Sequence, residues 1–151
     1  MTTTVSGVDA LFDLAGQHLG YSDWHEIDQD RINLFADATG DHQWIHVDPE
    51  RAQAGPFGAA IAHGYLTLAL LPVLLGEVWT VEGMAFGVNY GCNKVRFPSP
   101  VKVGSRLRAG AQVATVEPVD GGAQVTLDVT LETEGSTKPA CVAQVVYRYY
   151  T

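Results

Sequence analysis

Apolar and polar residues alternate over long stretches in the second half of the chain. Apolar side chains stand at every second position over 107–113 and over 125–131, a pattern that predicts strands with one buried and one solvent-exposed face. The Asp-Gly-Gly sequence at 120–122 predicts a hairpin turn between these two strands. Alternation over 141–149 predicts a last strand, so we expect an antiparallel sheet.

The alternation changes phase within residues 84–97. Apolar residues stand at even positions up to Cys92 and at odd positions from Val95 onward. One extra residue in a strand produces such a shift, so we expect a β-bulge near 91–94. Bulges are frequent beside active sites, which makes this strand a candidate for contact with a ligand.

Helix-capping residues stand at three places in the first half of the chain. Ser6, Asp28 and Asp48 each precede a segment that can form a helix, and Gly40 follows the second of these segments. Ser6 is followed three residues later by an acidic residue, as in a capping box. Alternation at 24–27 predicts a short strand.

Residues 62–75 are apolar on every side, and a helix of that kind must be surrounded by protein. Pro72 removes one helix hydrogen bond, so we expect a kink or an end there. These elements predict an α+β fold, in which an antiparallel sheet wraps around one buried apolar helix. We find no repeat or linker and treat residues 1–151 as a single domain. Because such a sheet leaves strand edges unpaired, we expect a second copy to pair with it.

Composition narrows the function classes. The chain is 46% hydrophobic and 17% charged, which is typical of an ordered globular domain. A net charge of −8 argues against nucleic acid as the main partner. The longest apolar stretch, 61–75, is too short to span a membrane, and residues 1–7 do not resemble a signal peptide. We interpret Cys92 and Cys141 as small buried hydrophobes in a reducing compartment, so a cytoplasmic protein is expected.

Basic residues gather in one short stretch of this acidic chain. Ten of the 17 acidic residues lie in the first 50 positions, whereas five of the nine basic residues lie between 94 and 108, where Asp and Glu are absent. These five are Lys94, Arg96, Lys102, Arg106 and Arg108. Such a patch would suit a small polyanionic ligand that carries phosphates. The alternative is that these side chains point outward from strands and only keep the protein soluble.

Candidate catalytic side chains concentrate between residues 40 and 65. Asp41 and His46 follow the helix end at Gly40, and in a loop the two can converge into a general acid/base pair that works near neutral pH. The alternative is that Asp41 bonds loop amides and His46 is structural. His63 and Gly64 begin the apolar helix, where free N–H groups and the missing side chain of glycine could stabilise an oxyanion such as that of a thioester.

Three motifs of the chain resemble one enzyme family. The sequence FADATGDHQWIHVDP at 35–49, with IAHG at 61–64 and KVRFPSPV at 94–101, resembles the MaoC-like (R)-specific enoyl-CoA hydratases over roughly residues 20–150. The resemblance implies a hot-dog fold, a homodimer and acyl-CoA thioester substrates. It also implies reversible addition of water to a trans-2-enoyl-CoA, giving the (3R)-hydroxyacyl-CoA. No cofactor is implied, because CoA is part of the substrate.

The resemblance assigns roles to individual residues. Asp41 and His46 match the family's catalytic Asp and His, and Gly64 matches the glycine whose N–H faces the thioester oxygen. Gln43 and Trp44 replace the Asn and Pro of the usual motif. Pro72 stands where some members have an assisting Ser.

Further residues are expected to bind the substrate: Ala62, His63, Gly64, Asn89, Gly91, Lys94 and Arg96. We expect His63 to contact substrate only through its backbone, and Asn89 and Gly91 to offer backbone groups to the thioester arm. Asp41, His42, His46 and His63 could also be metal ligands. The family needs no metal, so none is predicted.

Two other functions share the expected fold. A hot-dog acyl-CoA thioesterase would hydrolyse the thioester, and a non-catalytic acyl-CoA-binding subunit would act within a heteromeric dehydratase. The Gly-Asp…His pattern favours the hydratase over the thioesterase. The presence of both Asp41 and His46 argues against a subunit that only supports a catalytic partner.

Overall fold

The main sheet of the computed structural model, which describes residues 2–151, has six strands. Five of them lie in the order β2-β6-β7-β8-β5, and β3 also pairs with β6. Their bounds are His18–Tyr21 for β2, His25–Glu26 for β3, Phe86–Arg96 for β5, Arg106–Val119 for β6, Gly122–Thr133 for β7 and Cys141–Tyr150 for β8. All pairings in this sheet are antiparallel, which confirms the predicted sheet.

The hairpin between β6 and β7 follows the prediction. Gly121 has a φ of +78°, which a glycine adopts without strain, and Val119 pairs with Gly122 across the turn. On β7, Val125, Leu127 and Val129 are at most 2% exposed. The alternation of the sequence therefore identified the face of the sheet that packs into the core.

Strand β5 lies at one edge of the main sheet and carries the predicted irregularity. Its register against β8 shifts between Asn89 and Gly91 and again between Cys92 and Lys94, so the bulge prediction is confirmed. Most of β5 is exposed in the single chain. The prediction that Cys92 is buried is wrong for this reason, whereas Cys141 on β8 is buried as expected.

A second, two-stranded sheet pairs β1, Thr3–Ser6, in parallel with β4, Trp79–Glu82. Neither strand was predicted, and neither was β2. Each of the three has four residues, too few for alternation to stand out against the neighbouring sequence.

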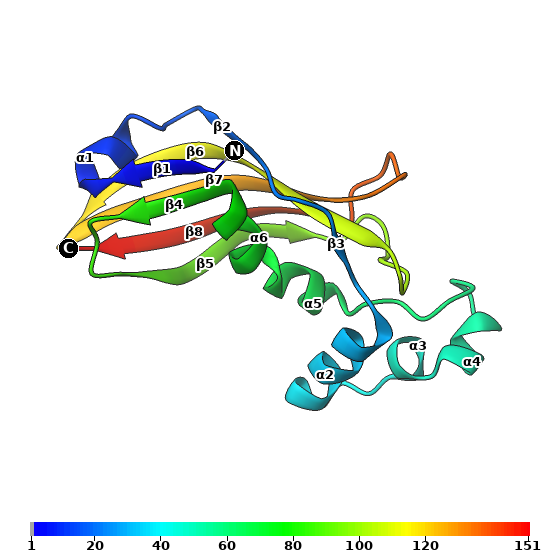
Figure 1. Ribbon diagram of the computed structural model, residues 1–151. Helices are drawn as coiled ribbons and strands as arrows, with labels where there is room; N and C mark the ends of the chain where they lie inside the picture. Colours follow the sequence, from blue (N-terminus) through cyan, green and yellow to red (C-terminus); the bar gives the residue numbers. More distant parts are fainter. Residues whose placement is uncertain (1) are drawn as a thin grey trace.

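Four helices precede the central one: α1 at Gly7–Phe12, α2 at Gln29–Thr39, α3 at Trp44–Val47 and α4 at Pro49–Gln53. Two predicted caps form, since the carboxylates of Asp28 and Asp48 accept the amides of Arg31 and Arg51. Ser6 stands at the start of α1 but makes no capping side-chain bond, so the capping box is wrong. Figure 1 shows that α2, α3 and α4 lie together beyond one end of the sheet.

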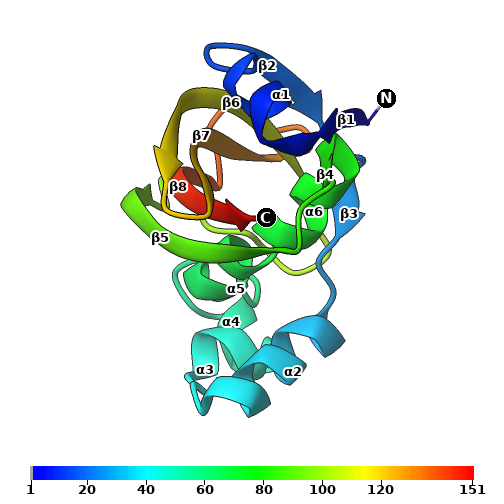
Figure 2. The same ribbon diagram turned by 90° about the vertical axis from the view of Figure 1, so that its left-hand side faces the viewer.

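The central helix is divided into α5, Gly64–Ala69, and α6, Leu71–Val78, with Pro72 in the first turn of α6. The predicted interruption at Pro72 is therefore confirmed. The main sheet curves around α6 (Figure 2), and Leu71, Leu74, Leu75 and Val78 are buried. The expectation that this helix is buried on every side is wrong, because Tyr65 is 73% exposed and Val73 is 61% exposed in the single chain.

A smaller hydrophobic cluster fixes the helical end of the molecule to the start of the central helix. Ile27 and Ile32, which flank the start of α2, are buried together with Ala62 and Leu66. This packing places the α2–α3 segment beside the start of α5. Within residues 2–151, we find no helix long and apolar enough to cross a bilayer.

Candidate active site

Two short segments of chain meet beside the start of α5. The first runs from Asp41 to His46, after Gly40 ends α2 with a φ of +84°. The second runs from Ile61 to Gly64. Asp41 lies in the expected loop, but His46 lies on the short helix α3, which corrects the expectation that both residues are in a loop. The Gln29 side-chain amide donates to the His46 carbonyl at 2.8 Å and ties α3 to α2.

The His46 ring is buried and its tautomer is defined by one hydrogen bond. Its Nδ1 lies 2.7 Å from the carbonyl oxygen of Ile61, an acceptor only, so Nδ1 carries the hydrogen and Nε2 has the free lone pair. Burial lowers the pKa of His46, and the nearby His63 lowers it further, while the Ile61 carbonyl and Asp41 act in the opposite direction. The ring is therefore a neutral proton acceptor at neutral pH.

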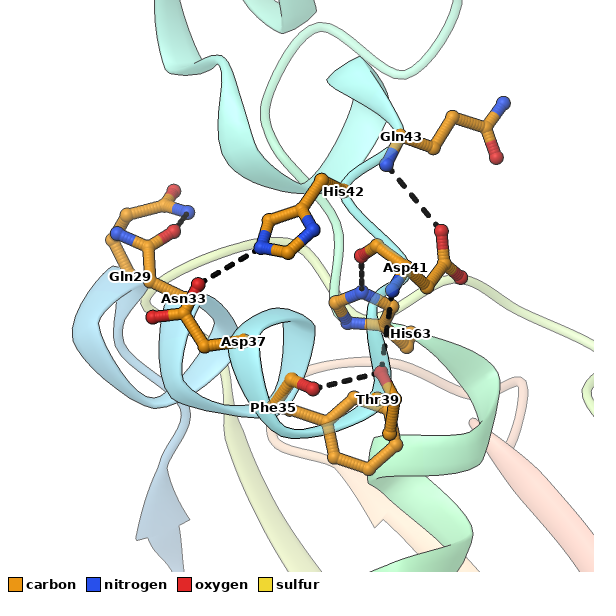
Figure 3. A network of polar contacts seen from close by, with 9 residues as sticks. All are labelled: Gln29, Asn33, Phe35, Asp37, Thr39, Asp41, His42, Gln43 and His63. Atoms are coloured by element: carbon orange, nitrogen blue, oxygen red, sulfur yellow. Dashed lines mark hydrogen bonds and ion pairs between the residues drawn. The ribbon is translucent and has the colours of Figure 1, made fainter.

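His63 is 3% exposed and contacts both predicted catalytic residues. Its Nε2 donates to the backbone carbonyl of Asp41 at 2.9 Å (Figure 3). Its ring stacks on that of His46, with 3.9 Å between centroids and 23° between planes. The histidine of each segment thus donates a hydrogen bond to a backbone carbonyl of the other segment. His46 donates to Ile61, and His63 donates to Asp41.

This reciprocal pair of hydrogen bonds brings the predicted acid and base together. A carboxylate oxygen of Asp41 and one ring nitrogen each of His46 and His63 lie within 4.8 Å of one another. That spacing suits a single water molecule held between the carboxylate and the imidazole. Asp41 is exposed, so its carboxylate is accessible from solvent.

The same three side chains are the strongest candidate for a metal site. In the stack, the lone pairs of the two histidines lie in planes only 23° apart, whereas the ligands of a zinc ion point inward from the corners of a tetrahedron. Coordination of one ion by both rings would require them to turn out of the stack. The arrangement fits an acid/base pair better than a metal centre.

A cavity of about 340 Å³ lies beside His46 and the start of α5. Its lining is mostly apolar and consists of His46, Phe57, Ile61, Ala62, Gly64, Thr67, Phe97, Ser99, Pro100, Val101 and Ala140. The Ala62 amide already donates to the Val101 carbonyl at 2.8 Å, which leaves only its methyl group and carbonyl for a ligand. Gly64 is the first residue of α5, where helix amides lack a partner in the preceding turn.

Asn89 and Gly91 do not line the cavity beside His46. They lie with Leu68 and Pro72 around a second cavity of about 310 Å³, between β5 and the junction of α5 and α6. The two cavities border successive parts of the central helix. The predicted contact of these two residues with the thioester arm stays a prediction.

The basic stretch does not form one patch, because β5 and β6 are separated in the sheet by β8 and β7. Arg106 pairs with Glu134 and Arg108 with Glu132, each at 2.9 Å. The interpretation of all five residues as a single phosphate-binding patch is therefore wrong. Lys94 and Arg96 remain exposed on β5.

Two parts of this site were missed by the sequence analysis: the side-chain role of His63 and the support of α3 by Gln29. His63 reaches across 22 residues to Asp41, and Gln29 reaches across 17 residues to His46. Contacts at such separations follow no helix or strand period. No local pattern could have identified them.

Comparison with known proteins places this arrangement in a family. Residues 12–135 match the model of the MaoC-like domain. The chain is 58% identical over 147 residues to 3-hydroxyacyl-thioester dehydratase Z of Mycobacterium tuberculosis, covering 97% of each chain. It is 50% identical over 133 residues to nodulation protein N of Rhizobium meliloti, covering 86% of this chain and 83% of the relative.

Solved structures show the same fold at lower identity. The unliganded R-hydratase PhaJ1 from Pseudomonas aeruginosa superposes with a TM-score of 0.71 at 24% identity, covering 90% of this chain and 81% of that one. The (R)-hydratase from A. caviae superposes with a TM-score of 0.69 at 24% identity, covering 88% of this chain and 94% of that one. These structures support the predicted hot-dog architecture. The chain belongs to the MaoC-like domain family and is an enzyme of its hydratase and dehydratase class.

Proposed function

We propose that the protein is an (R)-specific enoyl-CoA hydratase, which adds water to a trans-2-enoyl-CoA to give the (3R)-hydroxyacyl-CoA and catalyses the reverse dehydration. One observation carries this proposal: the Asp41 carboxylate lies within 4.8 Å of a His46 ring nitrogen. The cavity beside His46 supports it, as does the name of the mycobacterial relative, a 3-hydroxyacyl-thioester dehydratase.

The reaction needs a bound water molecule and a proton acceptor. Asp41 and His46 hold the water between them, and the pair takes one of its protons as the water oxygen bonds to C3. The electrons of the C2=C3 bond move toward the thioester, and the resulting enolate takes a proton from the pair at C2. Because coupled groups titrate together, we assign the acid and base roles to the pair rather than to single residues.

Charge develops on the thioester oxygen during this step. We propose that the N–H of Gly64 faces that oxygen, because Gly64 lines the cavity together with His46. A backbone donor aimed at a developing oxyanion typically contributes about 10²–10³ in turnover. Apolar residues of the cavity would contact the acyl group, and Lys94 and Arg96 would meet the phosphates of CoA.

We also propose a homodimer formed through β5. Large apolar side chains on this edge strand are exposed in the single chain, with Phe86 at 57%, Val88 at 39% and Tyr90 at 58%. Tyr65 and Val73 of the central helix add to the exposed apolar surface. Edge pairing with a second copy would cover β5 and satisfy its free backbone groups.

Two simultaneous assays with crotonyl-CoA test the activity. Loss of enoyl absorbance without release of free thiol supports a hydratase. Thiol release at the same rate would instead indicate a thioesterase, and no change in either assay would indicate a non-catalytic subunit. The hydrated product is then offered to an (S)-specific 3-hydroxyacyl-CoA dehydrogenase, which should not oxidise it.

A further inference from the structure

We propose that His63 is a positioning residue that fixes Asp41 and His46 relative to each other, an inference that rests on the proposed hydratase function. Its Nε2 binds the carbonyl of Asp41, and its ring stacks on His46. One buried side chain thus contacts both members of the pair, although they lie on different elements. The His63 ring is stacked on His46 and does not line the cavity, whereas the ring of His46 does.

The bond from His63 is the short link between Asp41 and the body of the protein. Asp41 follows the end of α2 and is exposed. Its other hydrogen bonds are local and longer, 3.5 Å from its amide to the Thr39 hydroxyl and 3.3 Å from the Gln43 amide to its carboxylate. The bond from His63 measures 2.9 Å and joins Asp41 to the residue that precedes α5. Without it, the loop would lose its connection to the central helix at this point.

The stack acts on the other member of the pair. His46 is held at Nδ1 by Ile61, but a single hydrogen bond leaves an imidazole free to tilt. The His63 ring at 3.9 Å covers one face of His46 and limits that tilt. The ring centroid of Phe35 lies 4.9 Å from that of His63, so Phe35 supports the His63 ring in turn. The Nε2 lone pair of His46 is therefore aimed by packing as well as by hydrogen bonding.

The cost of keeping a histidine here argues that its donor is needed. Within residues 2–151, the buried Nδ1 of His63 has no hydrogen-bond partner, and burying such a nitrogen lowers stability. A phenylalanine would fill the same space and stack on His46 without that cost. What it could not do is donate to the Asp41 carbonyl. The hydrogen bond to Asp41 is the property that distinguishes histidine at this position.

Two substitutions separate the hydrogen bond from the stack. His63→Phe keeps an aromatic ring against His46 and removes the donor, while His63→Gln keeps an amide donor near the former Nε2 and removes the ring. We expect His63→Phe to lower kcat by about 10-fold or more while KM changes by less than about 3-fold, because misplacing a catalytic group affects the chemical step. His63→Gln should recover part of that loss.

His42→Gln is the matched control. His42 belongs to the same loop, but its ring is exposed and binds Asp37 on α2 at 2.8 Å (Figure 3). This variant should keep the kcat of the parent. Equal kcat values for the parent, His63→Phe and His63→Gln would overturn the proposal, and so would an equal loss in His42→Gln.

An NMR titration of His46 tests the proposal without turnover. The titratable groups that face His46 are Asp41 from the loop and His63 from the residue before α5. Asp41 raises the pKa of His46, so Asp41→Asn should lower it. If His63 holds Asp41 in place, the shift caused by Asp41→Asn should shrink strongly in a His63→Phe background and persist in a His42→Gln background.

The two readouts distinguish the possible failures. An unchanged Asp41→Asn shift in the His63→Phe background overturns the positioning role, whatever the activity. An inactive parent overturns the proposed hydratase function, while the titration still decides the role of His63. If His63→Phe does not fold, the same cycle in the His63→Gln background decides. The retained donor should preserve the shift and the lost ring should reduce kcat only in part, whereas loss of the shift in this background would overturn the proposal.

Discussion

The Phe97 ring lies against Gly64 so closely that a Cβ atom at Gly64 would be 3.1 Å from two ring carbons. Both residues line the cavity beside His46. A side chain at position 64 would therefore displace Phe97 or occupy part of the proposed substrate space. This contact gives Gly64 a packing reason for lacking a side chain, in addition to its proposed role as a backbone donor.

Gly64→Ala is expected to reduce turnover of crotonyl-CoA by about 10²-fold, because a displacement of about 1 Å at the reacting atoms has that effect. It should also lower the melting temperature through strain against Phe97. Gly76→Ala on α6 is the control, since a Cβ there meets no atom within 4 Å and alanine favours a helix interior. That variant should be as active as the parent and at least as stable; equal activity of both variants would contradict the proposed role of Gly64.

Asp41→Asn and His46→Ala should each remove most of the activity. General acid–base contributions are typically about 10²–10⁴-fold in rate. If the pair acts on one water, the turnover of the double variant should be only slightly below that of the less active single variant. Steady-state kinetics on all three variants check this. Multiplicative losses in the double variant would show that the two residues act independently.

The same two variants should differ in stability. Asp41 is exposed, so Asp41→Asn should melt near the parent temperature. His46 is 7% exposed and bonded to the Ile61 carbonyl, and its removal leaves a buried acceptor without a donor, typically a cost of about 1–3 kcal/mol. Calorimetry should therefore show a lower melting temperature for His46→Ala alone.

The midpoint of the acid limb in the pH profile of kcat/KM should lie below pH 6.5. Burial lowers the pKa of His46 from its ordinary value of 6.5, so the neutral form persists to lower pH. Protonation then removes the Nε2 lone pair, and kcat/KM should fall as the pH drops through this lowered pKa. A profile of kcat/KM between about pH 5 and pH 8 covers the transition. A midpoint above 6.5 would show that burial does not control this residue.

Removing exposed positive charge on β5 should weaken binding of CoA substrates. Lys94→Ala and Arg96→Ala should raise KM more than they lower kcat, and less so at high salt. Arg106→Ala is the matched control, because Glu134 already neutralises Arg106 on a strand remote from β5 in the sheet. An unchanged KM in both β5 variants would mean that these side chains only face solvent.

Val88→Lys should convert the proposed dimer into a monomer of about 16.2 kDa. Val88 is 39% exposed on the edge strand β5, and a lysine there disfavours edge-to-edge pairing. Val142→Lys provides a comparison, because Val142 is 41% exposed but lies on β8, which is flanked on both sides. Light scattering that finds the parent itself to be a monomer would contradict the dimer.

Local chemistry made much of the fold predictable. Asp28 and Gly40 delimit α2 as expected, because capping and a positive φ depend only on nearby residues. The bulge in β5 left a phase change in the sequence, since the side-chain period of a strand is two. The proximity of Asp41 and His46 was also expected, although the helix that carries His46 was not.

Contacts between distant segments could not be predicted in the same way. The stack of His63 on His46 depends on how the start of α5 packs beside α3. The basic residues show the opposite case, because residues that are close in sequence lie on separate strands. The order of strands in the sheet separates Arg106 from Lys94, and sequence spacing carries no information about that order.

The two reciprocal histidine bonds close a ring of contacts around the segment between Asp41 and His63. The loop at 54–60 lies inside this ring, and its ends are fixed by α4 and by the bond from the Ile61 amide to the Ile45 carbonyl. Gly55 packs against Trp44 of α3 and Ala60 is buried, but the exposed residues 56–58 can vary in length and composition without moving the acid/base pair. Phe57 of this loop lines the cavity, so loop exchange here offers a route to altered acyl-chain range that leaves the reaction chemistry intact.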